Sequence, residues 1–114
     1  MAEASGTVDR VFRALSDPTR RKVLERLCQG PASVSELAKP FDMKLPSFVQ
    51  HLGILEESEL VSSAKTGRVR IYRIDLEKMK TAEDWLAKQR QLWERRLDQL
   101  DAYLLRLNKE RNSK

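Results

Sequence analysis

The sequence predicts a mainly α-helical domain of about five helices with one small β-hairpin. Three observations support this fold class. Apolar residues recur at helical spacing in short segments between residues 8 and 55, and proline and glycine separate these segments. A stretch rich in β-branched and aromatic residues surrounds a glycine between residues 60 and 74. After residue 81 the apolar residues take heptad spacing.

The first two helices are predicted from spacing and capping residues. Residues 1–6 are small and polar, so we expect them to be disordered. Asp17 is a suitable N-cap for a second helix, and Pro18 suits its first position. Gly30 with Pro31 is expected to end that helix. The buried face of the first helix is expected to contain Val8, Val11, Phe12 and Leu15, and that of the second Val23, Leu24, Leu27 and Cys28.

The segment 33–60 predicts two short helices joined by a tight turn. Ser33 and Glu36 have the spacing of a capping box at the start of the first helix. Pro40 is expected to end that helix, and Pro46 to open the next. The buried face of the second helix is expected to contain Phe48, Leu52 and Leu55. This is a helix-turn-helix pattern, whose second helix is shaped for a DNA major groove. The alternative is an αα corner that only builds a core.

A basic hairpin is predicted directly after this pair of helices. An extended run begins at residues 60–61, residues 65–68 form the turn, and Val69 to Ile74 form the returning strand. Between residues 60 and 74 there is no acidic residue, and the cations are Lys65, Arg68, Arg70 and Arg73. Such a hairpin is typical of a wing, whose tip contacts phosphates or an adjacent minor groove. The alternative is an ordinary hairpin with solubilising charge.

The C-terminal segment predicts a dimer. A helix is expected over about residues 81–108, in a segment 77–108, with a frayed tail at 109–114. A heptad seam on it contains Trp93, Leu97, Leu100, Leu104 and Leu107. A second copy of the chain could cover so long a seam, and the first helix, through Val8, Val11 and Phe12, is the expected partner surface. The alternative, packing on the chain's own core, would account for Trp85 and Leu86.

Composition limits the possible functions. Lys and Arg number 22 against 17 Asp and Glu, and the sequence pI is near 9.6, which permits a polyanionic partner. We expect an intracellular, cytoplasmic protein, because no apolar run resembles a signal peptide or a membrane span. We expect no enzyme, cofactor or metal site, since Cys28 and His51 are single and stand on different predicted helices. Cys28 is interpreted as a core residue rather than a redox switch.

The basic residues Arg20, Arg21 and Lys22 crowd the start of the second helix. They form either a solvated basic edge or a phosphate contact beside the recognition helix, since helix N-termini and basic side chains both favour phosphate.

Four segments of the chain resemble the ArsR family of winged helix-turn-helix repressors. They are FRALSDPTRRKVLERL (12–27), SVSELAKPF (33–41), LPSFVQHLGILEESELV (45–61) and TGRVRIYRID (66–75). The resemblance implies a winged domain over residues 7–76, dimeric through its first and last helices, that binds inverted repeats in promoters and represses transcription. The family's cysteine pairs and its histidine clusters on the last helix are missing, so a non-metal-sensing type is expected. The alternatives are a winged-helix module that binds an acidic protein, and a ligand or redox sensor of unknown effector.

The resemblance also implies the residues that meet double-stranded DNA. The recognition helix would contribute Lys44, Leu45, Ser47, Val49, Gln50 and His51. The wing would contribute Lys65, Thr66, Arg68 and Arg70, and further phosphate contacts would come from Arg20, Arg21 and Lys39. Lys44, Leu45 and Val49 stand where the family usually has small polar residues. Leu45 and Val49 therefore either contact thymine methyl groups or are simply packed.

Overall fold

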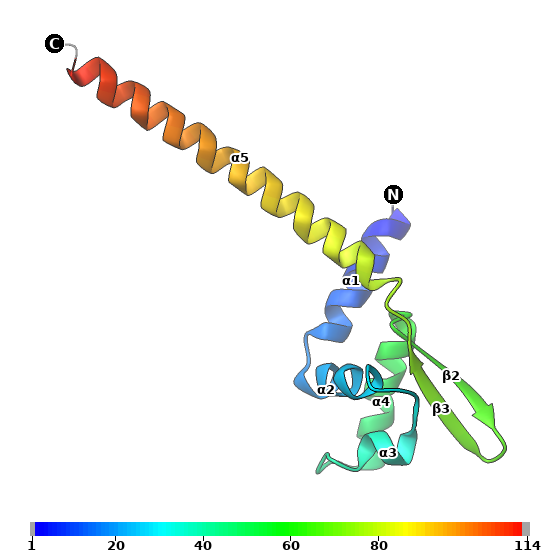
Figure 1. Cartoon of the computed structure of the whole chain (residues 1–114). Coiled ribbons are helices and arrows are strands. Elements are labelled where there is room, and N and C mark those ends of the chain that lie inside the picture. Colours follow the sequence, from blue (N-terminus) through cyan, green and yellow to red (C-terminus); the bar gives the residue numbers. More distant parts are fainter. Residues whose placement is uncertain (1, 113–114) are drawn as a thin grey trace. The chain divides into compact units, whose positions relative to one another are not determined.

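The structure, a computed structural model, describes the backbone of residues 2–112 and the side chains of residues 6–112. The elements are α1 (Ala2–Leu15), α2 (Pro18–Leu27), β1 (Ala32–Ser33), α3 (Val34–Ala38), α4 (Leu45–Glu57), β2 (Val61–Thr66), β3 (Val69–Ile74) and α5 (Met79–Asn112) (Figure 1). The predicted fold class is confirmed. The chain divides after Ala82 into two units, which we call the winged domain and the distal helix.

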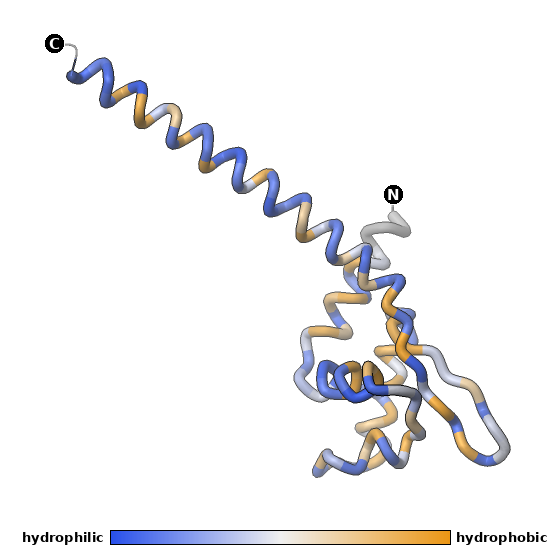
Figure 2. The backbone as a smooth tube through the Cα atoms, in the orientation of Figure 1, coloured by the Kyte–Doolittle hydropathy of each residue, from blue (hydrophilic) through white to orange (hydrophobic). Residues whose placement is uncertain are grey.

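The core of the winged domain lies between α1, α2, α3, α4 and the sheet. Its largest fully buried side chains are Phe48, Leu27, Leu37, Leu52, Leu55, Leu60, Val11 and Val23. Figure 2 shows hydrophobic stretches along the helices and the sheet of this domain, and hydrophobic positions interspersed among hydrophilic ones along α5. Burial of one such side chain contributes about 1.5–3 kcal/mol, so this cluster fixes how α4 sits in the domain.

Both predicted side-chain caps are present. The Asp17 carboxylate accepts hydrogen bonds from the N–H groups of Thr19 (2.8 Å) and Arg20 (3.2 Å). Burial raises the pKa of Asp17, but the hydrogen bonds from the Arg20 and Thr19 N–H groups and the charge of Arg20 hold this pKa below its usual value. At α3, the Ser33 hydroxyl accepts from the Glu36 N–H, and the Glu36 carboxylate accepts from the Ser33 N–H.

The sheet has one strand more than the sequence predicted. Its order is β1-β3-β2 and both pairings are antiparallel, with Ala32 opposite Tyr72 and Val61 opposite Ile74. Strand β1 has two residues, too few for an alternation pattern to show in the sequence. Between β2 and β3, Gly67 has a φ of 67°, a left-handed conformation that glycine adopts without a steric penalty. The hairpin of β2 and β3 projects from the helices (Figure 1).

Several expectations about individual positions are wrong. Helix α1 begins at Ala2, where disorder was expected. Val11 is fully buried in the core of its own chain, because α1 packs against α2 and α4, so it does not serve as a dimer contact. Cys28 is exposed, because α2 ends at Leu27 and the chain leaves the helix there. The expected frayed tail is helical as far as Asn112, and residues 113–114 lie outside the described part.

No helix within residues 2–112 is both long enough and apolar enough to span a lipid bilayer.

Candidate nucleic-acid interface

Helix α4 presents a solvent-exposed outer face because its inner face is fixed in the core. Phe48, Leu52 and Leu55 are fully buried, as predicted. The Phe48 ring also packs against Phe41, with ring centroids 5.4 Å apart, which joins α4 to the end of the preceding helix. On the other side of α4, the predicted DNA-facing residues Lys44, Leu45, Ser47, Val49 and Gln50 are exposed.

Leu45 and Val49 were expected either to contact thymine methyl groups or to be packed, and in the structure they are not packed. Leu45 is 55% exposed and Val49 is 46% exposed, and neither belongs to the core cluster. Helix α4 therefore carries two large apolar side chains on the surface predicted to meet DNA.

Arg20 holds a different position from the one expected. It is buried, its Nε donates to the Ala14 carbonyl (2.9 Å), and its Nη2 donates to the Arg13 carbonyl (2.8 Å). Its Nη1 lies 3.0 Å from Nδ1 of His51, which must accept because a guanidinium only donates. Arg20 thus satisfies the last carbonyls of α1 and ties them to α4, so neither a solvated edge nor a phosphate contact fits it.

His51 belongs to the same polar cluster. Its Nδ1 is 3.7 Å from the Asp17 carboxylate, and the side chain is only partly exposed. The Asp17–Arg20–His51 cluster therefore connects the start of α2, the end of α1 and the middle of α4. No sequence signal could have identified it, since the partners are up to 34 residues apart.

The other two residues proposed to contact phosphate are at the surface. Arg21 is exposed, and its Nη1 donates to the Leu15 carbonyl (2.8 Å). Lys39 is exposed at the C-cap of α3. Both positions are compatible with contact to a bound polyanion.

The wing is exposed and joined to α4 by polar contacts. Lys65, Thr66 and Arg68 are exposed at its tip. Lower down, Arg70 donates to the Ser63 hydroxyl (2.9 Å), which donates to the Glu56 carboxylate near the end of α4 (3.2 Å). These contacts fix the wing relative to the outer face of α4.

The neighbouring Tyr72 is buried beneath this chain of contacts. Burial raises the pKa of its phenol, and the charge of Glu56 and a hydrogen bond to it act in the same direction, while Arg70 and Ser63 act against them. Tyr72 therefore stays neutral over the physiological range. Sequence reasoning missed the roles of Ser63 and Glu56, which the β2–α4 packing creates.

The profile of a helix-turn-helix domain matches residues 15–64. The transcriptional repressor SdpR of Bacillus subtilis is 33% identical over 79 residues, which are 69% of this chain and 88% of the repressor. The crystal structure of an ArsR family transcriptional regulator, RHA00566, is 53% identical and has a TM-score of 0.75, over 79% of this chain and 93% of that one. The chain belongs to the ArsR family of winged helix-turn-helix transcriptional regulators.

Two further comparisons bear on this ArsR-family chain. The HTH-type transcriptional regulator Rv2034 of Mycobacterium tuberculosis is 42% identical over 67 residues, so the match spans 59% of this chain and 63% of that regulator. A homodimeric winged helix-turn-helix DNA-binding domain from Mycobacterium bovis, solved in solution, is 28% identical with a TM-score of 0.62, over 80% of this chain and 86% of that one.

The distal helix of this ArsR-family chain carries an uncovered apolar face. Its side chains are of the large apolar kind that usually fills a core, yet Trp93 is 62% exposed and Leu100 is 51% exposed. The whole predicted seam is exposed in the single chain, and Trp85 and Leu86 are about half exposed. On α1, Val8 and Phe12 are half-buried, and Phe12 packs against the core.

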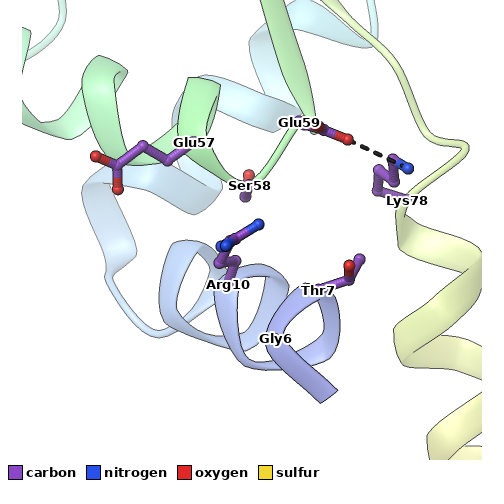
Figure 3. Close-up of a pocket in the computed structure, with 7 residues that line it drawn as sticks. All are labelled: Gly6, Thr7, Arg10, Glu57, Ser58, Glu59 and Lys78. Carbon is purple, nitrogen blue, oxygen red and sulfur yellow. Dashed lines mark ion pairs between the residues drawn. The ribbon is translucent and has the colours of Figure 1, made fainter. Parts of the chain in front are cut away.

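A polar pocket of about 450 Å³ lies between α1, the end of α4 and the segment before α5 (Figure 3). Arg10 and Thr7 line it from α1, and Lys78 and Glu59 form an ion pair of 3.2 Å at its edge. Glu57 and Ser58 complete the wall, and the Ser58 hydroxyl donates to the Leu55 carbonyl. The lining mixes both signs of charge and therefore indicates no particular class of ligand.

Among the described residues, no three His, Cys, Asp or Glu side chains come together as a group that could hold a metal ion.

Proposed function

We propose that this chain is a homodimeric, sequence-specific repressor that acts in the cytoplasm on an inverted-repeat operator. The observation that carries the proposal is the exposed outer face of α4, fixed beside a wing whose charged residues are all cations. The named relatives support it, because SdpR is a transcriptional repressor. The proposed role is not enzymatic.

The exposed polar and basic residues around α4 and in the wing each have a proposed role in DNA binding. Ser47 and Gln50 contact base edges, because their side chains can donate and accept hydrogen bonds in the major groove. Phosphates are contacted by Arg21, Lys39 and Lys44. The wing contributes Lys65, Thr66, Arg68 and Arg70, whose cations favour the phosphates and the negative potential of a narrow minor groove. His51 contributes by holding α4 in place, through its contact with Arg20.

The exposed apolar face of the distal helix supports the proposed dimer. The relative from Mycobacterium bovis with the same fold is homodimeric. Exposed leucines at heptad spacing bury one another most simply against a second copy. In this dimer two α4 helices would enter successive major grooves about 34 Å apart. Val8 and Phe12 are proposed to contribute from α1, and Trp93, Leu97, Leu100, Leu104 and Leu107 from α5.

The test is selection of binding sites from a random duplex library with the purified full-length chain. We expect an enriched inverted repeat, bound with an affinity that falls steeply with salt, by a log–log slope of about −0.9 for each phosphate contact. Recovery of no preferred sequence over bulk DNA contradicts the proposal and favours a basic module that binds an acidic protein.

Two variants separate base contacts from phosphate contacts. Gln50→Ala should relax the preference for the selected sequence. Arg68→Ala, the matched control, should weaken selected and random DNA about equally and reduce the salt slope by about 1. An unchanged sequence preference in Gln50→Ala would show that Gln50 does not contact bases.

A further inference from the structure

The outer face of α4 carries an apolar row that contacts to phosphates do not explain. Leu45, Val49 and Gly53 are spaced four residues apart, so they follow one another along one side of the helix. Leu45 is 55% exposed and Val49 is 46% exposed. Side chains of this kind gain free energy when another molecule removes them from water.

Gly53 extends this row as a bare patch of backbone. A Cβ built at Gly53 would meet no atom within 4 Å apart from its chain neighbours and the nearby backbone of α4, and the φ of Gly53 is not in the left-handed region. The fold therefore does not require glycine here, although glycine weakens a helix relative to alanine. A helix surface without a side chain allows another molecule to approach the backbone closely.

The row lies beside the residues proposed to contact bases. Val49 directly precedes Gln50, and Ser47 lies between Leu45 and Val49 in the chain, all of them exposed. Successive helix residues point about 100° apart, so Val49 and Gln50 share the exposed half of α4. A groove that encloses this half reaches both side chains. The exposed cations Lys44 and Lys39 nearby favour a polyanion over an apolar or basic protein as the occupant.

The chemistry of the groove then selects one kind of base. In the major groove, G, A and C present hydrogen-bond donors and acceptors, whereas thymine also presents its C5-methyl group. An apolar side chain has no other matching group on those edges. A buried polar edge opposite Leu45 or Val49 would lose its water without gaining a partner.

We propose that Leu45 and Val49 contact the C5-methyl groups of thymines in each half-site, and that Gly53 lets the edge of the groove approach the α4 backbone. This inference rests on the proposed function, since it requires α4 to lie in the major groove. It adds that part of the sequence preference is a preference for a methylated pyrimidine edge rather than for a hydrogen-bonding pattern.

The test uses deoxyuridine in the duplex that the full-length chain selects. Each thymine is replaced singly, which removes one methyl group and leaves the hydrogen-bonding edges unchanged. We expect two positions in each half-site at which the dissociation constant rises about fourfold, the value for one buried methyl group. If the dissociation constants of the thymine and deoxyuridine duplexes differ by less than twofold at every position, the inference is overturned.

Variants assign each methyl contact to its side chain. At one of the sensitive positions, Val49→Ala should bind the thymine and deoxyuridine duplexes equally, while it keeps the difference in affinity at the other. Leu45→Ala should show the reverse. Gln50→Ala, the control on the same helix, should keep both differences while its preference among the other bases falls. Retention of both differences in Val49→Ala and Leu45→Ala overturns the assignment.

Failure of this inference is distinguishable from failure of the proposed function. If the wild-type chain selects a sequence but does not distinguish thymine from deoxyuridine, the inference alone is refuted. If it selects no sequence, both are refuted. The deoxyuridine series uses wild-type protein, so it does not depend on the folding of any variant.

Discussion

Replacing Arg20 with alanine is expected to destabilise the winged domain by about 2–4 kcal/mol. The estimate comes from two acceptors that the change leaves without their donor, the Ala14 carbonyl and Nδ1 of His51. The Arg13 carbonyl also loses a hydrogen bond but still accepts from Ser16. A buried acceptor without a partner costs about 1–3 kcal/mol, and a partly buried one costs less. Since the melting temperature of a domain of this size shifts by about 4–8 °C per kcal/mol, it should fall by about 8–32 °C.

The assay is urea unfolding followed by circular dichroism at a fixed protein concentration, with thermal melts as a second measure. Arg21→Ala is the matched control, because Arg21 is the next residue but is exposed; we expect a change within about 0.5 kcal/mol. Arg20→Lys keeps the charge but loses the planar fork of donors, so it should recover only part of the stability.

Equal stability of Arg20→Ala and wild type, within about 0.5 kcal/mol, would refute the reasoning. So would a loss in Arg21→Ala as large as that in Arg20→Ala. For a folded Arg20→Ala variant, the salt slope of DNA binding should be unchanged, because Arg20 contributes no phosphate contact.

Gly53→Ala should raise the free energy of unfolding by about 0.5–1 kcal/mol and weaken DNA binding in gel shifts; tighter binding would argue against close approach at this position. Asp17→Ala should lower the free energy of unfolding at pH 7 by about 1 kcal/mol. Because the folded pKa of Asp17 is below its unfolded value, wild-type Asp17 contributes this stability above pH of about 4 and loses it as the pH falls further, so the two urea midpoints should converge in acid. Leu100→Lys should give the mass of a single chain in sedimentation at micromolar concentration, whereas Leu105→Lys, off the heptad seam, should remain dimeric.

Local signals in the sequence predicted much of this fold. The Asp17 cap, the Ser33–Glu36 capping box and the buried Phe48, Leu52 and Leu55 all depend on residues within one or two turns of each other. Spacing and capping chemistry act over that range, so they are visible before any tertiary structure is known.

The errors concern contacts between distant segments. Arg20 was expected to be a solvated cation or a phosphate contact, because the sequence does not show that the last carbonyls of α1 turn toward it. Val11 was assigned to the dimer surface, since periodicity identifies an apolar face but not what covers it. Strand β1 forms only because β3 lies beside it.

The candidate interface, too, could be predicted only in part from the sequence. The exposed face of α4 and the basic wing could be predicted, since charge and helical periodicity are local properties. The Arg70–Ser63–Glu56 contacts that join them could not, because they depend on how β2 packs against α4.

The most direct test of the account is a hydroxyl-radical footprint of the selected duplex with wild-type protein and with Leu100→Lys. We expect wild type to protect two half-sites whose centres are about 10–10.5 base pairs apart, or a multiple of that spacing, because a symmetric dimer places two α4 helices on one face of the duplex. The monomeric variant should lose both protections at the same concentration. A wild-type footprint of a single half-site, or equal protection by both proteins, would contradict the claim that the exposed seam of α5 pairs two chains for DNA binding.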